Sequence, residues 1–457
     1  MSQKHFDVLV IGGGVVGCAM ARHFTLAGAS VALLEKAPDV LDGASKGNSA
    51  ILHTGFDAPP DSLELACIQR GHALYLRDHA GLQLPILRTG ALVLAWNAEQ
   101  MAKLPALIAK GQANGVSDIR MLSRAQILAR EPHLSETVVG GFEVPGEVVI
   151  DPWTTAHVYL LQAMANGATL LRSAEVLSGD FDGAHWRLRT SADEITGKQV
   201  INCAGLYGDI VDTALLGEST FFIRPRKGQF LVFDKAASRL SSSILLPVPT
   251  DKTKGIVICP TIFGNLLVGP TAEDQDSRTD ASTDRETLES LRMTGKRMLP
   301  GLASFEVTAA YAGLRPACAA PGYQVRRVPD MNYVSVGAIR STGLSAALGL
   351  AEQVAEMLGR GDHVPMIDPQ MPEVERLSDY HGRDWQEPGY GEIVCHCERV
   401  TRREIDRVLA GPMPPRSLQG LKRRTRVCMG RCQGFYCRGT VAQICGDRLD
   451  MPQEDAA

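Results

Sequence analysis

The chain has 457 residues, which is too long for one ordinary hydrophobic core and indicates several domains. It is 45% hydrophobic and 21% charged, as in ordinary soluble globular proteins. The formal net charge is −4, and no long basic run interleaved with aromatic residues occurs, which argues against nucleic acid as a partner. No stretch approaches the roughly 20 apolar residues that span a bilayer, and no secretion signal is evident. We therefore expect a cytoplasmic protein that meets a membrane only through partners.

The N-terminal segment has the pattern of a dinucleotide-binding unit. Residues 6–11 predict a buried strand, a glycine turn and a helix to about Ala27 follow, and residues 30–35 predict a second strand. Gly28 stands where a glycine that ends a helix belongs. A strand, turn, helix and strand within about 30 residues are what a Rossmann unit requires.

Three glycines of this unit, Gly12, Gly14 and Gly17, fit the spacing G-x-G-x-x-G. The first allows the tight turn, the second allows the backbone to approach a pyrophosphate, and the third allows close packing of helix and strand. Glu35 ends the second strand and is placed to accept hydrogen bonds from an adenosine ribose, while its charge disfavours NADP. A glycine loop without a ligand is the alternative, and the surrounding pattern argues against it.

Further elements follow along the chain, and their type is mixed. Helical patterns lie near 62–79, 97–114 and 152–166, strand-like runs at 198–203, 229–233, 256–259 and 266–269, and a last strand and helix over 332–358. Residues 361–391 are polar and rich in Pro, Asp and Gly, and predict a linker. Strands between the Rossmann parts predict a second domain inserted into the first.

Cysteines are concentrated at the C-terminal end of the chain. Of the 11 cysteines, five lie in residues 1–394 and six in residues 395–457. An odd, clustered set in a cytosolic chain indicates metal or redox chemistry and not disulfides. We therefore expect a small cysteine-rich module after the linker.

Several segments resemble the D-amino-acid-oxidase-like superfamily of FAD-dependent oxidoreductases over roughly residues 5–360. They are residues 44–56, Asn-Cys-Ala-Gly at 202–205 and the late helix start at 341–349. The resemblance is closest to the branch of glycerol-3-phosphate dehydrogenases and L-2-hydroxyglutarate oxidases. The pieces that match this branch are GNSAILHTGF, VIDPWTTA, GNLLVGPTAED and YAGLRPA. Residues 341–345 read STGLS, where the anaerobic glycerol-3-phosphate dehydrogenase large subunit has a segment of the Gly-Gly-Lys type. This departure affects the expected substrate more than the expected cofactor.

The resemblance implies FAD as the cofactor. In this superfamily the late helix directs its N-terminus at the flavin pyrimidine, where the positive end of its dipole stabilises the reduced ring; an ordinary packing helix is the alternative. The cofactor-binding residues that it implies are Gly12, Gly14, Gly17, Glu35, Lys36, Ser45, Asn48, Ser49, Val176, Gly205, Thr342, Gly343 and Leu344.

The resemblance also implies the domain plan of an α/β protein. A Rossmann-type FAD-binding domain of about 1–80, 140–215 and 330–360 would carry an inserted substrate domain with a mixed or antiparallel sheet at about 81–139 and 216–329. The linker at 361–391 and a small α-helical iron–sulfur module at 392–457 would follow.

The substrates of this branch carry a hydroxyl carbon and an anionic group. Oxidation needs a base for the hydroxyl proton, and His53, in the segment that resembles the flavin-edge loop, is the leading candidate; it could instead bind the flavin or fix the loop. Arg315, in YAGLRPA, matches an arginine above the flavin, and its fork suits a carboxylate or phosphate; a buried ion pair is the alternative. Lys254 is more naturally a solvated loop residue, and the role of Arg340 is open.

The cysteine module resembles the small [2Fe–2S] domain of bacterioferritin-associated ferredoxin, which is also fused to some flavin dehydrogenases. Its cysteines suit iron–sulfur clusters or zinc, and a zinc knuckle remains the alternative. The fused forms imply the ligands Cys395, Cys397, Cys432 and Cys437. A rival set uses Cys428 in place of Cys437, and Cys445 fits a buried helix position.

Together these features predict an FAD-dependent dehydrogenase of a small hydroxylated anion, with glycerol 3-phosphate first and L-2-hydroxyglutarate second. Electrons would pass through the [2Fe–2S] cluster to a partner subunit, carrier or quinone. One alternative is an amine or amino-acid oxidase of the same superfamily, which the cysteine module disfavours because oxygen takes electrons straight from reduced flavin. Another is a non-catalytic electron-transfer subunit, which the presence of His53 and Arg315 disfavours.

Overall fold

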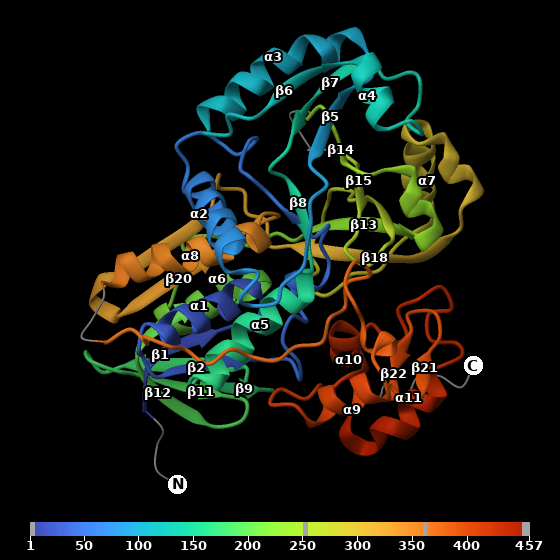
Figure 1. Ribbon diagram of the computed structural model, residues 1–457. Helices are drawn as coiled ribbons and strands as arrows, with labels where there is room; N and C mark the ends of the chain where they lie inside the picture. The colour runs from blue at the N-terminus through green and yellow to red at the C-terminus, as the bar shows by residue number, and fades with distance from the viewer. Residues whose placement is uncertain (1–4, 250–254, 360–362, 450–457) are drawn as a thin grey trace.

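The computed structural model describes residues 5–249, 255–359 and 363–449. A sheet flanked by helices carries both the N-terminal strand and the last strand before the linker, and a second sheet lies above it (Figure 1). The C-terminal module, in red, lies beside both parts (Figure 1). Among the described residues, no helix combines the length and the apolar character needed to cross a bilayer.

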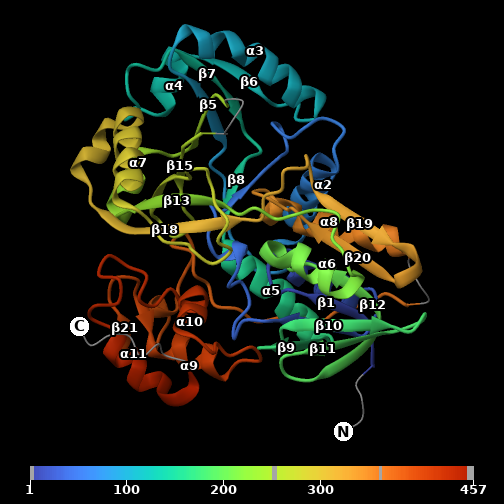
Figure 2. The same ribbon diagram turned by 180° about the vertical axis from the view of Figure 1, so that it is seen from behind.

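The first sheet has eight strands and contains the predicted Rossmann unit. Its central strands pair in parallel in the order β12–β1–β2–β9, and the central apolar runs are buried because helices cover both faces. Helices α1, α5 and α8 lie on one face, with α2 packed on α8, and α6 lies on the other face, as Figures 1 and 2 show together. The strands are β1 (His5–Ile11), β2 (Val31–Glu35), β9 (Thr169–Arg172), β10 (Val176–Phe181), β11 (Trp186–Thr190), β12 (Glu194–Asn202), β19 (Gln324–Val328) and β20 (Tyr333–Gly337), and the helices are α1 (Val15–Leu26), α2 (Leu63–Asp78), α5 (Pro152–Ala165), α6 (Gly208–Leu216) and α8 (Gly343–Leu358).

The second sheet has nine strands, is mixed, and is covered by three helices. Its strands are β5 (Ala91–Ala95), β6 (Arg120–Ser123), β7 (Gly140–Val144), β13 (Arg226–Phe233), β14 (Ile244–Pro247), β15 (Val257–Pro260), β16 (Leu266–Gly269), β17 (Glu273–Asp274) and β18 (Val307–Arg315). The helices are α3 (Ala98–Ala113), α4 (Arg124–Arg130) and α7 (Arg285–Met298). A separate small sheet is formed by β3 (Ile51–Leu52), β8 (Val148–Ile150) and β4 (Ile86–Leu87), paired in that order.

This architecture confirms the predicted fold class, a Rossmann-type sheet with an inserted mixed sheet and a small helical module. Two strands belong to the other sheet than the expected domain boundaries imply. Residues 140–144 form β7, which pairs with β5 in the second sheet, and residues 324–328 form β19, which pairs with β20 in the first. Strand pairing decides which sheet each of these segments joins, and sequence periodicity does not report the pairing.

The module consists of β21 (Ile393–Cys395), β22 (Val400–Thr401), α9 (Arg402–Ala410), α10 (Leu418–Thr425) and α11 (Arg438–Cys445). The described part of the preceding linker forms no strand, contains the short helical turn η6 (Asp384–Gln386), and buries Leu377 and Ser378. Its backbone is tied down, because Met366 N donates to Leu26 O at 2.9 Å and Asp379 N donates to Ile262 O at 3.1 Å. The linker therefore holds the module against the rest of the chain.

Candidate functional site

The three motif glycines after β1 differ in the space around them. Gly12 and Gly17 are required by close contacts between backbone segments, whereas Gly14 has open space beside it. A Cβ atom on Gly12, whose φ is +103°, would lie 2.6 Å from the carbonyl oxygen of Cys203, and one on Gly17 would lie 1.9 Å from the carbonyl oxygen of Gly12. A Cβ atom on Gly14 would meet only the Ser45 hydroxyl, at 3.1 Å. Gly14 precedes α1 and offers no side-chain cap, and Val15 N donates to the Ser45 hydroxyl at 3.0 Å, so the other amides of the first turn are the candidates for binding an anionic group.

Glu35 closes the end of β2 beside these glycines. Its carboxylate accepts hydrogen bonds from Gly13 N at 2.7 Å and Ala37 N at 2.8 Å, and burial raises its pKa. The next residue, Lys36, places its ammonium nitrogen 3.1 Å from the ring centroid of Tyr207. Both side chains line the cavity, where a ribose hydroxyl and a nucleotide base find polar and cationic partners.

A cavity of about 830 Å³ extends from the glycine loop to the start of α8, which is within the range of roughly 300–1,000 Å³ typical of cofactor and ligand sites. Of the predicted cofactor-binding residues, those that line it are Gly12, Gly14, Glu35, Lys36, Ser45, Asn48, Ser49, Val176, Gly205, Gly343 and Leu344. Gly17 and Thr342 do not line it. Gly17 acts through packing, and the buried Thr342 hydroxyl donates to Glu64 at 2.8 Å and lies 2.6 Å from the Tyr323 hydroxyl.

His53 lines the same cavity and is held from two sides. Its Nδ1 atom lies 2.8 Å from Oε2 of Glu147, whose side chain is fully buried. Its backbone N–H donates to the Ser345 hydroxyl at 2.8 Å, which ties the loop to the first turn of α8. Because a carboxylate accepts, Nδ1 carries the proton and Nε2 is left as the basic nitrogen.

Arg315, at the end of β18, is a half-buried cation that no carboxylate pairs with in the part of the chain that the structure describes. Among the described residues no acidic side chain forms an ion pair with it, and Nη2 donates only to the carbonyl oxygen of Thr271, at 3.1 Å. Burial, with a smaller contribution from Arg226, lowers its pKa to about 10. A Cβ atom on Gly228 would lie 2.5 Å from Nη2, so this glycine makes room for the guanidinium.

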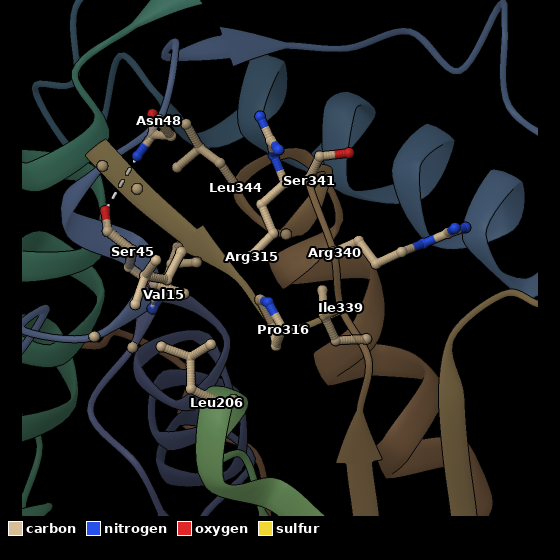
Figure 3. Close-up of a pocket in the computed structure, with 18 of the residues that line it drawn as sticks. Val15, Ser45, Asn48, Leu206, Arg315, Pro316, Ile339, Arg340, Ser341 and Leu344 are labelled. Atoms are coloured by element: carbon tan, nitrogen blue, oxygen red, sulfur yellow. Dashed lines mark hydrogen bonds between the residues drawn. The ribbon is translucent and has the colours of Figure 1, made fainter. Parts of the chain in front are cut away.

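Figure 3 shows the Arg315 side chain extending from β18 into the pocket, toward the segment of Ser341 and Leu344, while Arg340 points away from it. The neighbouring arginines are neutralised by carboxylates of the chain. Arg226 bonds Asp274, Arg278 bonds Asp209 and Arg340 bonds Glu64, at 2.6, 2.6 and 3.4 Å. Arg340 therefore has a structural partner, and Arg315 is left for an anion. Lys254 lies outside the described residues.

Five cysteines of the module lie close together. Within the part of the chain that the structure describes, no three His, Cys, Asp or Glu side chains converge on a position for a single metal ion. The four predicted ligands form two pairs instead, Cys397 with Cys432 and Cys395 with Cys437. Two pairs of thiols suit a cluster of two irons that takes four thiolates.

Some of these thiols are costly to ionise without a cation, whereas hydrogen bonds from the backbone, first from Tyr436, lower the pKa of Cys432. Burial raises the pKa of Cys395 and of Cys437 to about 11. The fifth thiol, Cys428, is buried, has a left-handed backbone with a φ of +62°, and lies 3.5 Å from the Cys437 sulfur. Cys428 is thus a neighbour of the Cys395–Cys437 pair. The two ligand sets therefore differ only in which of two adjacent sulfur atoms, that of Cys437 or that of Cys428, is used.

One of the contacts that dock the module is made by a buried carboxylate that follows β2. Asp39 Oδ2 accepts hydrogen bonds from Ser417 N at 2.8 Å and from the Ser417 hydroxyl at 2.7 Å, where α10 begins. Arg424 of the same helix lies 3.3 Å from Asp39 Oδ1. A Cβ atom on Gly420 would lie 2.2 Å from Asp39 Oδ2. The cysteine module is therefore fixed to the loop that lines the nucleotide end of the cavity.

Sequence reasoning missed Glu147, Thr271 and Asp39. Glu147 offered one signal, because it is an acidic residue directly before the apolar run of β8, where a charge is kept only with a partner. Asp39 and Thr271 offered none, since each acts through residues that are remote in sequence.

Comparison with known proteins assigns both parts of the chain. Residues 7–357 match the family model "FAD dependent oxidoreductase", and residues 393–446 match "BFD-like [2Fe-2S] binding domain". A glycerol 3-phosphate dehydrogenase of Caloramator mitchellensis is 31% identical over 98% of this chain and 95% of its own length. An L-2-hydroxyglutarate dehydrogenase of Caenorhabditis briggsae is 27% identical over 78% of this chain and 86% of its own.

The structure is similar to that of L-alpha-glycerophosphate oxidase from Mycoplasma pneumoniae with FAD bound. The TM-score is 0.75 at 28% identity, over 81% of this chain and 100% of that one. The predicted cofactors, FAD and a [2Fe–2S] cluster, are confirmed by these matches, and the cavity beside α1 and the paired thiols fit the two groups. The chain belongs to the family of FAD-dependent oxidoreductases and carries a BFD-like [2Fe–2S]-binding domain at its C-terminal end.

Proposed function

We propose that the protein is a dehydrogenase that oxidises glycerol 3-phosphate and passes the electrons through its [2Fe–2S] cluster to a partner subunit, carrier or quinone. The observation that carries this proposal is Arg315, a half-buried guanidinium that lines the cavity and has no carboxylate partner among the described residues. A half-buried cation of this kind calls for an anionic group, which a phosphate ester supplies. The relatives named for glycerol 3-phosphate support the same substrate.

FAD, when bound, supplies the hydride acceptor. The guanidinium of Arg315 binds the phosphate, and Nε2 of His53 takes the proton of the hydroxyl group that is oxidised. Glu147 keeps the proton on Nδ1 and stabilises the imidazolium that forms. Thus the anion is held by one residue and the proton is moved by another.

On the acceptor side, we propose Cys395, Cys397, Cys432 and Cys437 as the cluster ligands. Phe435 and Tyr436, between two of these cysteines, are 82% and 78% exposed. This segment leaves the edge of the module open, as electron transfer to an acceptor requires. The domain plan, with β7 assigned to the substrate domain and β19 to the FAD-binding domain, and the predicted FAD-contacting residues that line the cavity are part of the same proposal.

The test is an anaerobic titration of the flavin absorbance with one compound from each chemical class. Glycerol 3-phosphate should bleach the flavin at the lowest concentration. If L-2-hydroxyglutarate, named for one relative, bleached the flavin more efficiently, it would take the place of glycerol 3-phosphate as the proposed substrate. Bleaching by an amino acid alone would contradict the proposal.

A further inference from the structure

A line of packed side chains joins the flavin cavity to the cysteine module, and none of the roles above uses it. It begins at Trp153, in the first turn of α5, whose indole N–H donates to the carbonyl oxygen of Lys46 at 3.1 Å. Lys46 and Pro152, the neighbour of Trp153, both line the cavity. One end of the line therefore lies at the wall of the flavin site.

The line continues through Phe263, in the turn between β15 and β16. The rings of Trp153 and Phe263 are stacked, with centroids 5.3 Å apart and an interplanar angle of 15°. On the side of the module, the guanidinium carbon of Arg426 lies 4.0 Å from the centroid of the Phe263 ring. Arg426 Nε in turn donates to Glu398 at 2.8 Å, and Glu398 directly follows the ligand Cys397. The other end of the line lies at the cluster.

We propose that Trp153 and Phe263 are positioning residues that provide the packed route by which electrons cross from the flavin to the cluster. The inference rests on the proposed function for the order flavin first, cluster second. Electrons tunnel more readily through contacting atoms than across gaps, and large stacked rings fill the interface without gaps. For each hydride taken from the substrate, two electrons cross singly, each reduces the cluster by one electron, the acceptor reoxidises the cluster in between, and the proton leaves to solvent.

The two rings are not needed to hold the module in place, because other contacts do so. Asp39 binds the start of α10, and Lys235 lies 3.2 Å from Glu398 and 2.7 Å from Asp379. Phe263 is only 6% exposed, so its ring lies between the two parts of the chain and not on a free surface. A route for electrons explains why aromatic side chains stand at this point of the interface.

The test uses the full chain with both cofactors bound. The flavin is reduced in a stopped-flow mixer by glycerol 3-phosphate, flavin absorbance follows its reduction, and freeze-quench electron paramagnetic resonance follows the cluster. Phe263→Leu and Trp153→Leu should leave the rate of flavin reduction unchanged and slow the appearance of the reduced cluster by an order of magnitude. Phe263→Tyr should restore the rate, and the resonance line shape of the cluster should be the same in all variants.

Lys235→Met is the matched control, because it removes the two ion pairs that Lys235 makes with Asp379 and Glu398 and leaves the ring stack intact. Its cluster should be reduced at the rate of the unmodified protein. Unchanged cluster reduction in both leucine variants, or equal slowing in Lys235→Met, would overturn the route. If glycerol 3-phosphate leaves the flavin oxidised, the proposed function fails instead, and photochemical reduction with a free deazaflavin still measures the transfer.

Discussion

His53 and Glu147 form a buried pair in which the imidazole Nδ1 lies 2.8 Å from a carboxylate oxygen. The same carboxylate also accepts from the backbone N–H and the hydroxyl of Thr54, at 2.7 and 2.8 Å. Three donors therefore fix the orientation of Glu147, and through it the orientation and tautomer of the imidazole. This arrangement holds the His53 imidazole in a fixed orientation at the wall of the cavity.

His53→Ala should slow flavin reduction by about a hundredfold or more, the usual contribution of a general base, with a smaller effect on substrate binding. Glu147→Gln should slow it less, because the ring keeps its place and loses the carboxylate that stabilises the imidazolium. Stopped-flow reduction at several substrate concentrations separates rate from binding. His72→Ala is the control, since His72 contacts Gly146 O at 3.0 Å beside the same turn. An unchanged rate in His53→Ala would remove His53 as the base.

Arg315→Lys should weaken substrate binding more than a conservative change suggests, because a point charge does not replace the bidentate fork. The loss of one charge-assisted contact costs on the order of 2 kcal/mol, or about thirtyfold in the dissociation constant. Titration of the flavin spectrum measures this constant. Arg226→Lys should change it little, since Arg226 is already paired with Asp274. Equal weakening in the two variants would show that Arg315 is not the specific anion site.

Gly14→Val should give a folded protein without FAD, because the added side chain meets only the Ser45 hydroxyl and otherwise projects toward the pyrophosphate position. Gly17→Ala should lower the thermal stability instead, because its Cβ atom would clash with the backbone of Gly12. The ratio of flavin to protein absorbance and a circular-dichroism melting curve distinguish the two effects. Full flavin content in Gly14→Val would place the phosphates elsewhere.

Cys437→Ser should abolish the cluster, and Cys428→Ser should leave it intact, if the four paired thiols are the ligands. Both thiols lie at the same end of the site, only 3.5 Å apart, so the two variants are well matched. Iron and acid-labile sulfide per chain, with the visible spectrum, report the outcome. The reverse pattern would assign the second pair to Cys395 and Cys428.

The parts of the site that sequence predicts are those built from neighbours along the chain. The strand, glycines, helix and Glu35 lie within about 30 residues, where local periodicity and turn chemistry decide the structure. The late helix start and the cysteine spacing were predicted on family resemblance. In the glycine unit, the late helix start and the cysteine module alike, the residues that suggest the chemistry lie within the segment itself.

The rest depends on contacts between remote residues. His53 and Glu147 are 94 positions apart, and Asp39 and Ser417 are 378 positions apart. Neither pair has a periodic pattern, and each forms only because sheet pairing or module docking brings two loops together. For the same reason, that Arg315 has no acidic partner among the described residues, which is the basis for proposing it as the anion site, is visible only in three dimensions.

The central claim is that substrate electrons reach the iron–sulfur cluster through the flavin of the same chain. The most direct measurement is electron paramagnetic resonance of the anaerobic protein after reduction with glycerol 3-phosphate, together with iron and zinc analysis. The account predicts iron and sulfide in the proportions of a [2Fe–2S] cluster and a reduced-cluster signal that appears after the flavin is bleached. Zinc in the module, or a bleached flavin beside a cluster that stays oxidised even with an acceptor partner added, would contradict it.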